Sequence, residues 1–217
     1  MDSIIRNKKE LEFWIQADCM MNHGKWKLSM MHRIANIIKG VYIDEYLIAM
    51  RKTLYYSYLK TSSSGINKLL WGGVFTYWKL LYDRIGMKLG FSIGFKCFGY
   101  GLVIPHNGTI VVGGDNRCGR YCVLHTSTCI SGEHGGKRIG DALYLSSGAK
   151  VNKPIQLGNN VQIASNSVVN KSFYEDNIVL AGMPATIKKT ENPTWYQGWD
   201  AENRVAMIEE LRKQLFK

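Results

Sequence analysis

The chain has 217 residues, of which 46% are apolar, 12% aromatic and 21% charged, so it is long enough to bury a sizeable core. This composition excludes collagen-like, mucin-like and disordered chains. Lysine and arginine number 28 against 17 aspartates and glutamates, and the net charge of +11 favours anionic partners such as an acidic membrane surface, nucleic acid or a phosphorylated cofactor.

The five cysteines do not have the spacing of a metal site, so we expect small, reduced, buried side chains and no bound metal. Residues 1–13 mix acids and bases and contain no continuous apolar run, which is not the pattern of a signal peptide. Lysine and arginine also interrupt every longer apolar stretch, so no membrane-spanning helix is predicted. These features predict a cytoplasmic protein.

Residues 1–88 are predicted to form a helical N-terminal region. Apolar residues recur there at three- and four-residue spacing, as in Ile43, Leu47, Met50 and Leu54. A break at 61–65 precedes a further helix that is rich in aromatic and basic residues. Two interpretations of this region stay open: core and oligomer contacts of a helical appendage, or peripheral contact with the inner face of a membrane.

Residues 89–190 contain a six-residue repeat. Each sixth residue is aliphatic and is followed by a small or turn-forming residue; the aliphatic set is Ile139, Leu145, Val151, Leu157, Ile163 and Val169. A second phase runs from Val112 to Ile130, and its continuation backwards falls on His106. A period of six is typical of a short strand followed by a turn, three of which close one triangular coil.

The predicted fold is therefore mainly β: a parallel β-helix of hexapeptide repeats, with an α-helical N-terminal region and a C-terminal helix. Residues 191–217 form the C-terminal helical extension, with apolar residues at helical spacing such as Ile208 and Leu211. A solenoid has two ends that need covering, and we expect the N-terminal helices and this extension to cap them.

Two segments carry a family resemblance: IPHNGTIVV at 104–112 and LAGMPATI at 180–187. Together with the repeats, they resemble the acyl-CoA-dependent hexapeptide acetyltransferases, and most closely the serine-acetyltransferase-like branch that includes capsule and O-antigen O-acetyltransferases. The resemblance covers residues 90–190. It implies a left-handed β-helix, acetyl-CoA as co-substrate, and a homotrimer whose active sites lie between neighbouring subunits.

The same resemblance implies that His106 is the general base. An imidazole suits this role because its ordinary pKa of about 6.5 lets it accept a proton from a hydroxyl near neutral pH. His125 and His134 are further candidates for contact with the substrate, because relatives carry histidines at similar places. Asp115 or Glu133 could orient an imidazole, although Asp115 is more simply a turn residue.

The expected cofactor site follows the family, in which CoA lies in a groove between neighbouring coils. Small residues that would allow its pantetheine arm to approach are Ser146, Ser147, Gly148, Ala164 and Ser165. Ala181, Gly182 and Pro184 match the loop that lines the cofactor near the last coil. Lys188 and Lys189 could bind the nucleotide phosphates, or could simply be a solvated pair of charges.

The acceptor is expected to be a sugar hydroxyl of a bacterial surface polysaccharide or its precursor. Serine-binding relatives carry Asp before the catalytic histidine, and this chain has Pro105 there. The alternatives are serine O-acetylation in cysteine biosynthesis and a catalytically silent β-helix scaffold. Nucleic acid is not expected as a partner, because no recognised binding motif accompanies the basic charge.

Overall fold

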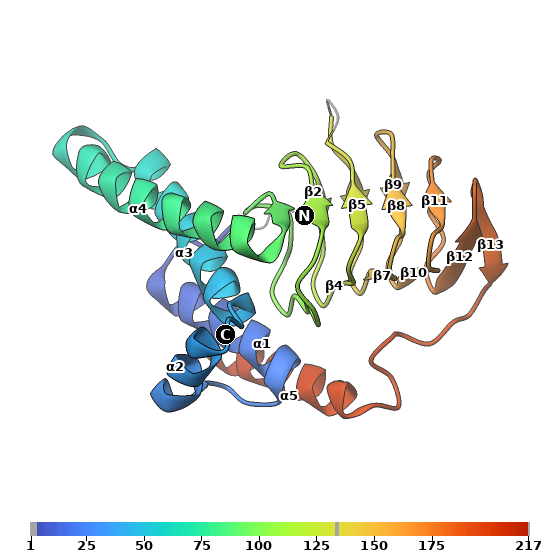
Figure 1. Ribbon diagram of the computed structural model, residues 1–217, viewed down its shortest axis with the longest axis horizontal. Helices are drawn as coiled ribbons and strands as arrows, with labels where there is room; N and C mark the ends of the chain where they lie inside the picture. The colour runs from blue at the N-terminus through green and yellow to red at the C-terminus, as the bar shows by residue number, and fades with distance from the viewer. Residues whose placement is uncertain (1–3, 133–134, 217) are drawn as a thin grey trace.

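The computed structural model describes residues 4–132 and 135–216. Within these residues, four helices precede a solenoid of short strands and one helix follows it (Figure 1). The helices are α1 (Lys8–His23), α2 (Met30–Ile38), α3 (Ile43–Ser62), α4 (Gly65–Leu89) and α5 (Asp200–Leu215). No helix in these ranges has the length and apolarity needed to cross a membrane.

Along the described chain, the strands stack into three sheets that form the sides of the solenoid. The first sheet has the order β1 (Phe91–Ile93), β2 (Ile110–Val112), β5 (Thr128–Ile130), β8 (Lys150–Val151) and β11 (Val168–Val169). The second has the order β4 (Val123–Leu124), β7 (Tyr144–Leu145), β10 (Val161–Ile163), β12 (Ile178–Gly182) and β13 (Ala185–Lys189). The third contains β3 (Arg117–Cys118), β6 (Arg138–Ile139) and β9 (Gln156–Leu157).

Neighbouring strands pair in parallel, except β12 and β13, which form an antiparallel hairpin. The six aliphatic residues of the repeat are buried inside the coils, with exposed fractions between 0% and 5%. The predicted left-handed parallel β-helix with helices at both ends of the chain is therefore confirmed. The six-residue period predicted this fold correctly because each short strand contributes one inward side chain before the backbone turns.

The N-terminal helices cap the first coil, as expected. Tyr46 of α3 and Tyr82 of α4 stack with ring centroids 4.7 Å apart, and both belong to the same buried cluster as Phe91 and Ile93 of β1. The Tyr82 hydroxyl donates a hydrogen bond to the backbone carbonyl of Ile93. The apolar column of the solenoid thus continues without a break into the helices.

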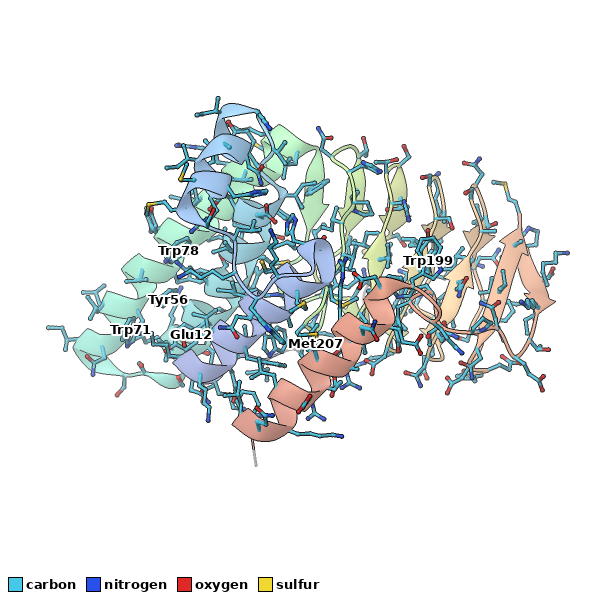
Figure 2. All side chains as sticks on the ribbon, turned by 90° about the horizontal axis from the view of Figure 1, so that it is seen from below. Glu12, Tyr56, Trp71, Trp78, Trp199 and Met207 are labelled. Atoms are coloured by element: carbon cyan, nitrogen blue, oxygen red, sulfur yellow. The ribbon has the colours of Figure 1, made fainter. Side chains whose placement is uncertain are left out.

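The C-terminal helix does not cap the far end of the solenoid, and this expectation was wrong. The chain runs back along the second sheet, where the Gln162 side chain donates to the Pro193 carbonyl at 3.0 Å and Trp195 Nε1 donates to the Tyr121 carbonyl at 2.8 Å. Helix α5 then packs beside α1, with Ile208 fully buried in a shared aromatic cluster (Figure 2). The β12–β13 hairpin occupies the far end instead (Figure 1).

Candidate active site

His106 is exposed at a corner of the solenoid, where the chain passes from the second sheet to strand β2 of the first sheet. Val103 pairs with Val123, so Ile104 is level with Leu124 and takes the buried position. Ile110 pairs with Thr128. The chain therefore takes six steps from Ile104 to Ile110, whereas the next coil takes only four from Leu124 to Thr128. This corner is therefore two residues longer than the corresponding corner of the next coil. For this reason the six-residue spacing of inward side chains does not extend back to His106, which is exposed.

The helices hold this corner on both sides. Asn22 of α1 donates to the Leu102 carbonyl at 2.8 Å, and its Oδ1 accepts from the Ile104 backbone N–H at 3.3 Å. On the other side, the Gly108 N–H donates to the carbonyl of Leu89, the last residue of α4, at 2.9 Å. A Cβ atom on Gly90 would lie 2.9 Å from the Gly108 carbonyl oxygen, so this close approach requires glycine.

A buried ion pair supports the same backbone. Arg51 of α3 and Asp18 of α1 form two hydrogen bonds of 2.7 and 3.1 Å, and both side chains are almost completely buried. Arg51 also donates to the Phe98 and Gly99 carbonyls, while Asp18 accepts from the Leu102 N–H at 3.0 Å. The first coil is thus fastened to two helices just before it reaches His106.

His125 lies near His106, one coil further on and just after β4. Its Nε2 atom is 2.8 Å from the hydroxyl oxygen of Tyr144 on β7. Partial burial lowers the pKa of His125, and the positive charge that His106 can carry lowers it further. His125 is therefore neutral at pH 7, and the structure brings these two predicted histidines together. The sequence analysis did not identify Tyr144. The repeat could have done so, because Leu145 is level with Leu124, and Tyr144 and His125 are the neighbours of these two residues.

A column of small residues continues from His125 along the second sheet. Leu124, Leu145, Ile163 and Leu180 pair in register, so the residues that follow them stack in the order His125, Ser146, Ala164 and Ala181. Backbone hydrogen bonds of 2.9–3.1 Å join each of these positions to the next coil. Three of the predicted cofactor residues therefore form one continuous strip that begins at a histidine.

The remaining predicted cofactor residues lie at the next positions of the same corner. Ser147 and Ser165 are exposed in successive turns, and Gly182 and Pro184 are exposed in the β12–β13 turn. Gly148 is buried, and a Cβ atom there would lie 2.0 Å from Asn166 Oδ1. Close stacking of the coils alone accounts for a glycine at 148.

Lys188 and Lys189 are exposed at the end of β13, and Lys189 pairs with Val179 at the start of β12. They are thus at the opposite end of the hairpin from the Gly182 turn. His134 and Glu133 lie outside the described residues. Asp115 is exposed in the corner between the first and third sheets, a different corner from that of the two histidines, and so does not orient His106.

All five cysteines are free thiols. Burial raises the pKa of Cys19 to about 11 and that of Cys97 and Cys122 to about 12, and it raises the pKa of Cys118 well above its usual value. These four thiols are protonated at neutral pH and are poor nucleophiles. The residues described include no group of three His, Cys, Asp or Glu side chains placed to hold a metal ion.

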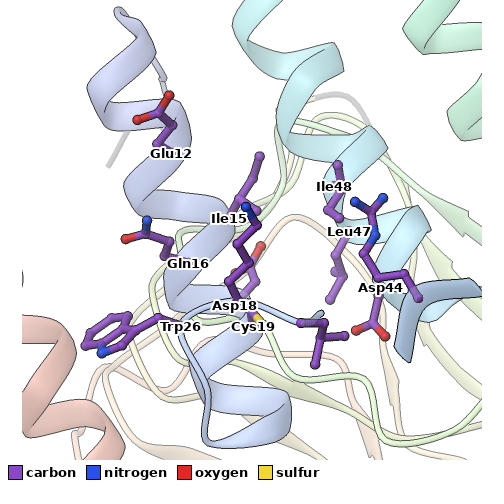
Figure 3. A pocket seen from close by; sticks show the side chains of 12 residues that line it. Glu12, Ile15, Gln16, Asp18, Cys19, Trp26, Asp44, Leu47 and Ile48 are labelled. Carbon is purple, nitrogen blue, oxygen red and sulfur yellow. The ribbon is translucent and has the colours of Figure 1, made fainter. Parts of the chain in front are cut away.

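A separate cavity of about 410 Å³ lies between α1, α3 and the segment before α2, with Gln16, Trp26 and Leu47 in its walls (Figure 3). The two aspartates in its lining already have partners. Asp18 pairs with Arg51, and Asp44 contacts His23 at 2.6 Å. The cavity belongs to the helical region and does not include His106 or His125.

No protein-family model matches the chain. It is 32% identical over 94 residues to a serine acetyltransferase of Synechococcus elongatus, covering 41% of this chain and 38% of that protein. It is also 32% identical over 145 residues to a serine acetyltransferase of Staphylococcus xylosus, covering 63% of this chain and 64% of that protein. The chain thus spans less than two thirds of both relatives.

Solved structures share the fold. A serine acetyltransferase from Neisseria gonorrhoeae aligns with a TM-score of 0.58 at 21% identity, covering 86% of this chain and 68% of that one. A serine acetyltransferase in complex with CoA aligns with a TM-score of 0.57 at 17% identity, covering 83% and 70%. Both sequence relatives are thus serine acetyltransferases, and the solved structures share the solenoid fold of this chain.

Proposed function

We propose that the protein is an acetyl-CoA-dependent O-acetyltransferase with His106 as general base. The observation that carries this proposal is the meeting of His106 and His125 in one corner, from which the strip of small residues Ser146, Ala164 and Ala181 begins. His106 is exposed, so an acceptor hydroxyl can reach its imidazole.

In the proposed reaction, the His106 imidazole takes the proton of the acceptor hydroxyl as the oxygen attacks the thioester carbonyl of acetyl-CoA. The carbon–sulfur bond then breaks, and the imidazolium returns the proton to the departing CoA thiolate. The acetyl group passes directly to the acceptor, and no acyl-enzyme forms. The raised pKa values of four cysteines agree with direct transfer, because a protonated thiol attacks a thioester poorly.

The pantetheine arm of the cofactor would lie along the strip of small residues, with Ser147, Gly148, Ser165, Gly182 and Pro184 at the adjoining turns. Lys188 and Lys189, at the end of the hairpin, would bind the nucleotide phosphates. The relative solved with CoA supports this cofactor. No metal has a role in the proposed reaction.

L-Serine is the acceptor that the sequence relatives support, since both are serine acetyltransferases. They favour serine over the sugar hydroxyl that the sequence alone suggested. The glycan acceptor stays as a second candidate because of Pro105. An aspartate before the base can hold the amino group of free serine, whereas proline has no charge to do so.

We also propose that the protein works as a homotrimer. His106 and the strip of small residues lie on the outer surface of the chain, and a neighbouring copy would close this surface into a groove. Light scattering is expected to give three times the mass of the chain. A monomer that is fully active at high dilution would contradict a shared site.

The test of function is the release of CoA from acetyl-CoA, followed with a thiol reagent, with L-serine and with a panel of sugars and bacterial glycans. His106→Asn is expected to lower kcat by about 10²–10⁴-fold. His32→Asn, on α2, is the matched control and should keep the wild-type rate. Full activity in His106→Asn would overturn the mechanism, and turnover with a glycan alone would replace serine as the acceptor.

A further inference from the structure

Helix α2 presents its apolar face to solvent. Met30, Met31, Ile34 and Ile38 follow the spacing of one helix face, and their exposed fractions are 79%, 83%, 51% and 80%. None of the nine residues of this helix is buried. The face continues to Val41, which is 43% exposed. Contiguous exposed apolar patches of this kind mark sites of interaction.

The polar side of α2 faces the protein instead. Arg33 forms two hydrogen bonds of 2.8 and 2.7 Å with the carboxylate of Glu45 on α3. Asn36 donates to Asp44 at 3.2 Å. A surface helix normally buries its apolar stripe and exposes its charges, and α2 does the reverse. Its attachment through polar contacts holds the apolar face outward, where a partner can cover it.

The charge of the segment that contains this helix indicates the partner. Residues 24–43 include Lys25, Lys27, Arg33 and Lys39 and contain no aspartate or glutamate. Lys25, Lys27 and Lys39 are exposed. A second copy that docked through the same face would bring these like charges together, at a cost in binding free energy. An anionic lipid surface complements both features, because its headgroups attract lysine and its acyl boundary accepts apolar side chains.

We propose that α2 is an interfacial helix that binds the protein to anionic membrane surfaces. The apolar face of Met30, Met31, Ile34 and Ile38 enters the boundary between headgroups and acyl chains, and the exposed lysines contact lipid phosphates. With nine residues, the helix is about 14 Å long, so it lies in the plane of the membrane. This proposal is independent of the acetyltransferase reaction.

The test is flotation of the full chain with vesicles of phosphatidylcholine, with and without about 30% phosphatidylglycerol. The wild-type protein is expected to float with the anionic vesicles and to stay unbound with phosphatidylcholine alone. The double variant Ile34→Asp/Ile38→Asp should lose about tenfold or more of the binding. The triple variant Lys25→Gln/Lys27→Gln/Lys39→Gln should lose the preference for anionic lipid.

The matched control is Leu69→Asp on α4, a leucine that is 78% exposed on a different helix, and it should bind vesicles like the wild type. Circular dichroism and light scattering of each variant report on folding and mass. Loss of binding in Leu69→Asp with normal binding in the α2 variant would overturn the proposal. A wild-type protein that does not bind anionic vesicles would also overturn it. In that case, a smaller assembled mass of the α2 variant would show that α2 binds a second copy instead.

Discussion

The Nε2 atom of His125 and the hydroxyl oxygen of Tyr144 lie 2.8 Å apart and join two successive coils beside His106. Their ring centroids are 5.0 Å apart with an angle of 52° between the planes, so the two rings also pack against each other. This hydrogen bond, together with the ring contact, fixes the orientation of the imidazole. Tyr144 thereby orients a neutral imidazole next to the proposed base.

Replacing Tyr144 with phenylalanine tests this positioning role. The variant keeps the ring contact and removes the hydrogen bond, so kcat is expected to fall about tenfold with the melting temperature nearly unchanged. The kcat–pH profile should also change, because the pKa of His125 depends on its hydrogen bond with the Tyr144 hydroxyl. Tyr174→Phe, at an exposed tyrosine, is the control. A wild-type rate and pH profile in Tyr144→Phe would show that the bond has no role in the reaction.

The lowered pKa of His125 predicts a pH dependence of stability. The unfolded chain binds a proton on this residue near the ordinary pKa of 6.5, whereas the native state resists protonation until a lower pH. The contribution to stability is therefore complete above pH 6.5 and is lost as the pH falls toward the native pKa. Thermal unfolding at pH 7.5 and pH 5.5 measures the change. His125→Gln should reduce the loss at acid pH, and His32→Gln should not. An unchanged pH dependence in His125→Gln would contradict the prediction.

The solenoid could be predicted from sequence because its signal is local. One inward aliphatic residue per strand repeats every six positions, and burial of residues such as Leu145 and Ile163 follows directly. The path of the C-terminal segment could not be predicted in this way. It depends on long-range contacts, including the hydrogen bond of Trp195 to Tyr121 and the burial of Ile208 against α1, which leave no periodic pattern.

The candidate site could be predicted in part for the same reason. The register of the coils follows from the repeat, so Ser146, Ala164 and Ala181 fall in one strip as soon as the period is known. The corner of His106 breaks the period, and its position depends on Asn22 and on the end of α4, more than 15 residues away along the chain. The inverted face of α2 was likewise hidden, since helical spacing shows that one face is apolar but not which way it points.

The buried Asp18–Arg51 pair predicts a large loss of stability when one partner is neutralised. Asp18→Asn leaves a guanidinium with 0% exposure without its counter-charge, and the free energy of unfolding should fall by about 3–5 kcal/mol. Urea denaturation measures the change. Asp83→Asn breaks the exposed Lys79–Asp83 pair of α4 and should cost at most about 0.5 kcal/mol. Equal effects of the two substitutions would mean that the buried pair does not fasten the helices to the first coil.

The strip of small residues predicts a selective loss of cofactor binding when it is filled. Ala164 lies in its middle and is partly exposed, so Ala164→Leu projects a larger side chain into the space proposed for the pantetheine arm while the inward residues stay in place. The KM for acetyl-CoA should rise about tenfold or more, and the melting temperature should stay close to that of the wild type. Ser92→Leu, at an exposed position of β1 on another face of the solenoid, is the control and should leave the KM unchanged. An Ala164→Leu enzyme with a wild-type KM would mean that the cofactor binds elsewhere, because a leucine side chain cannot share the volume of a chain that lies against the backbone.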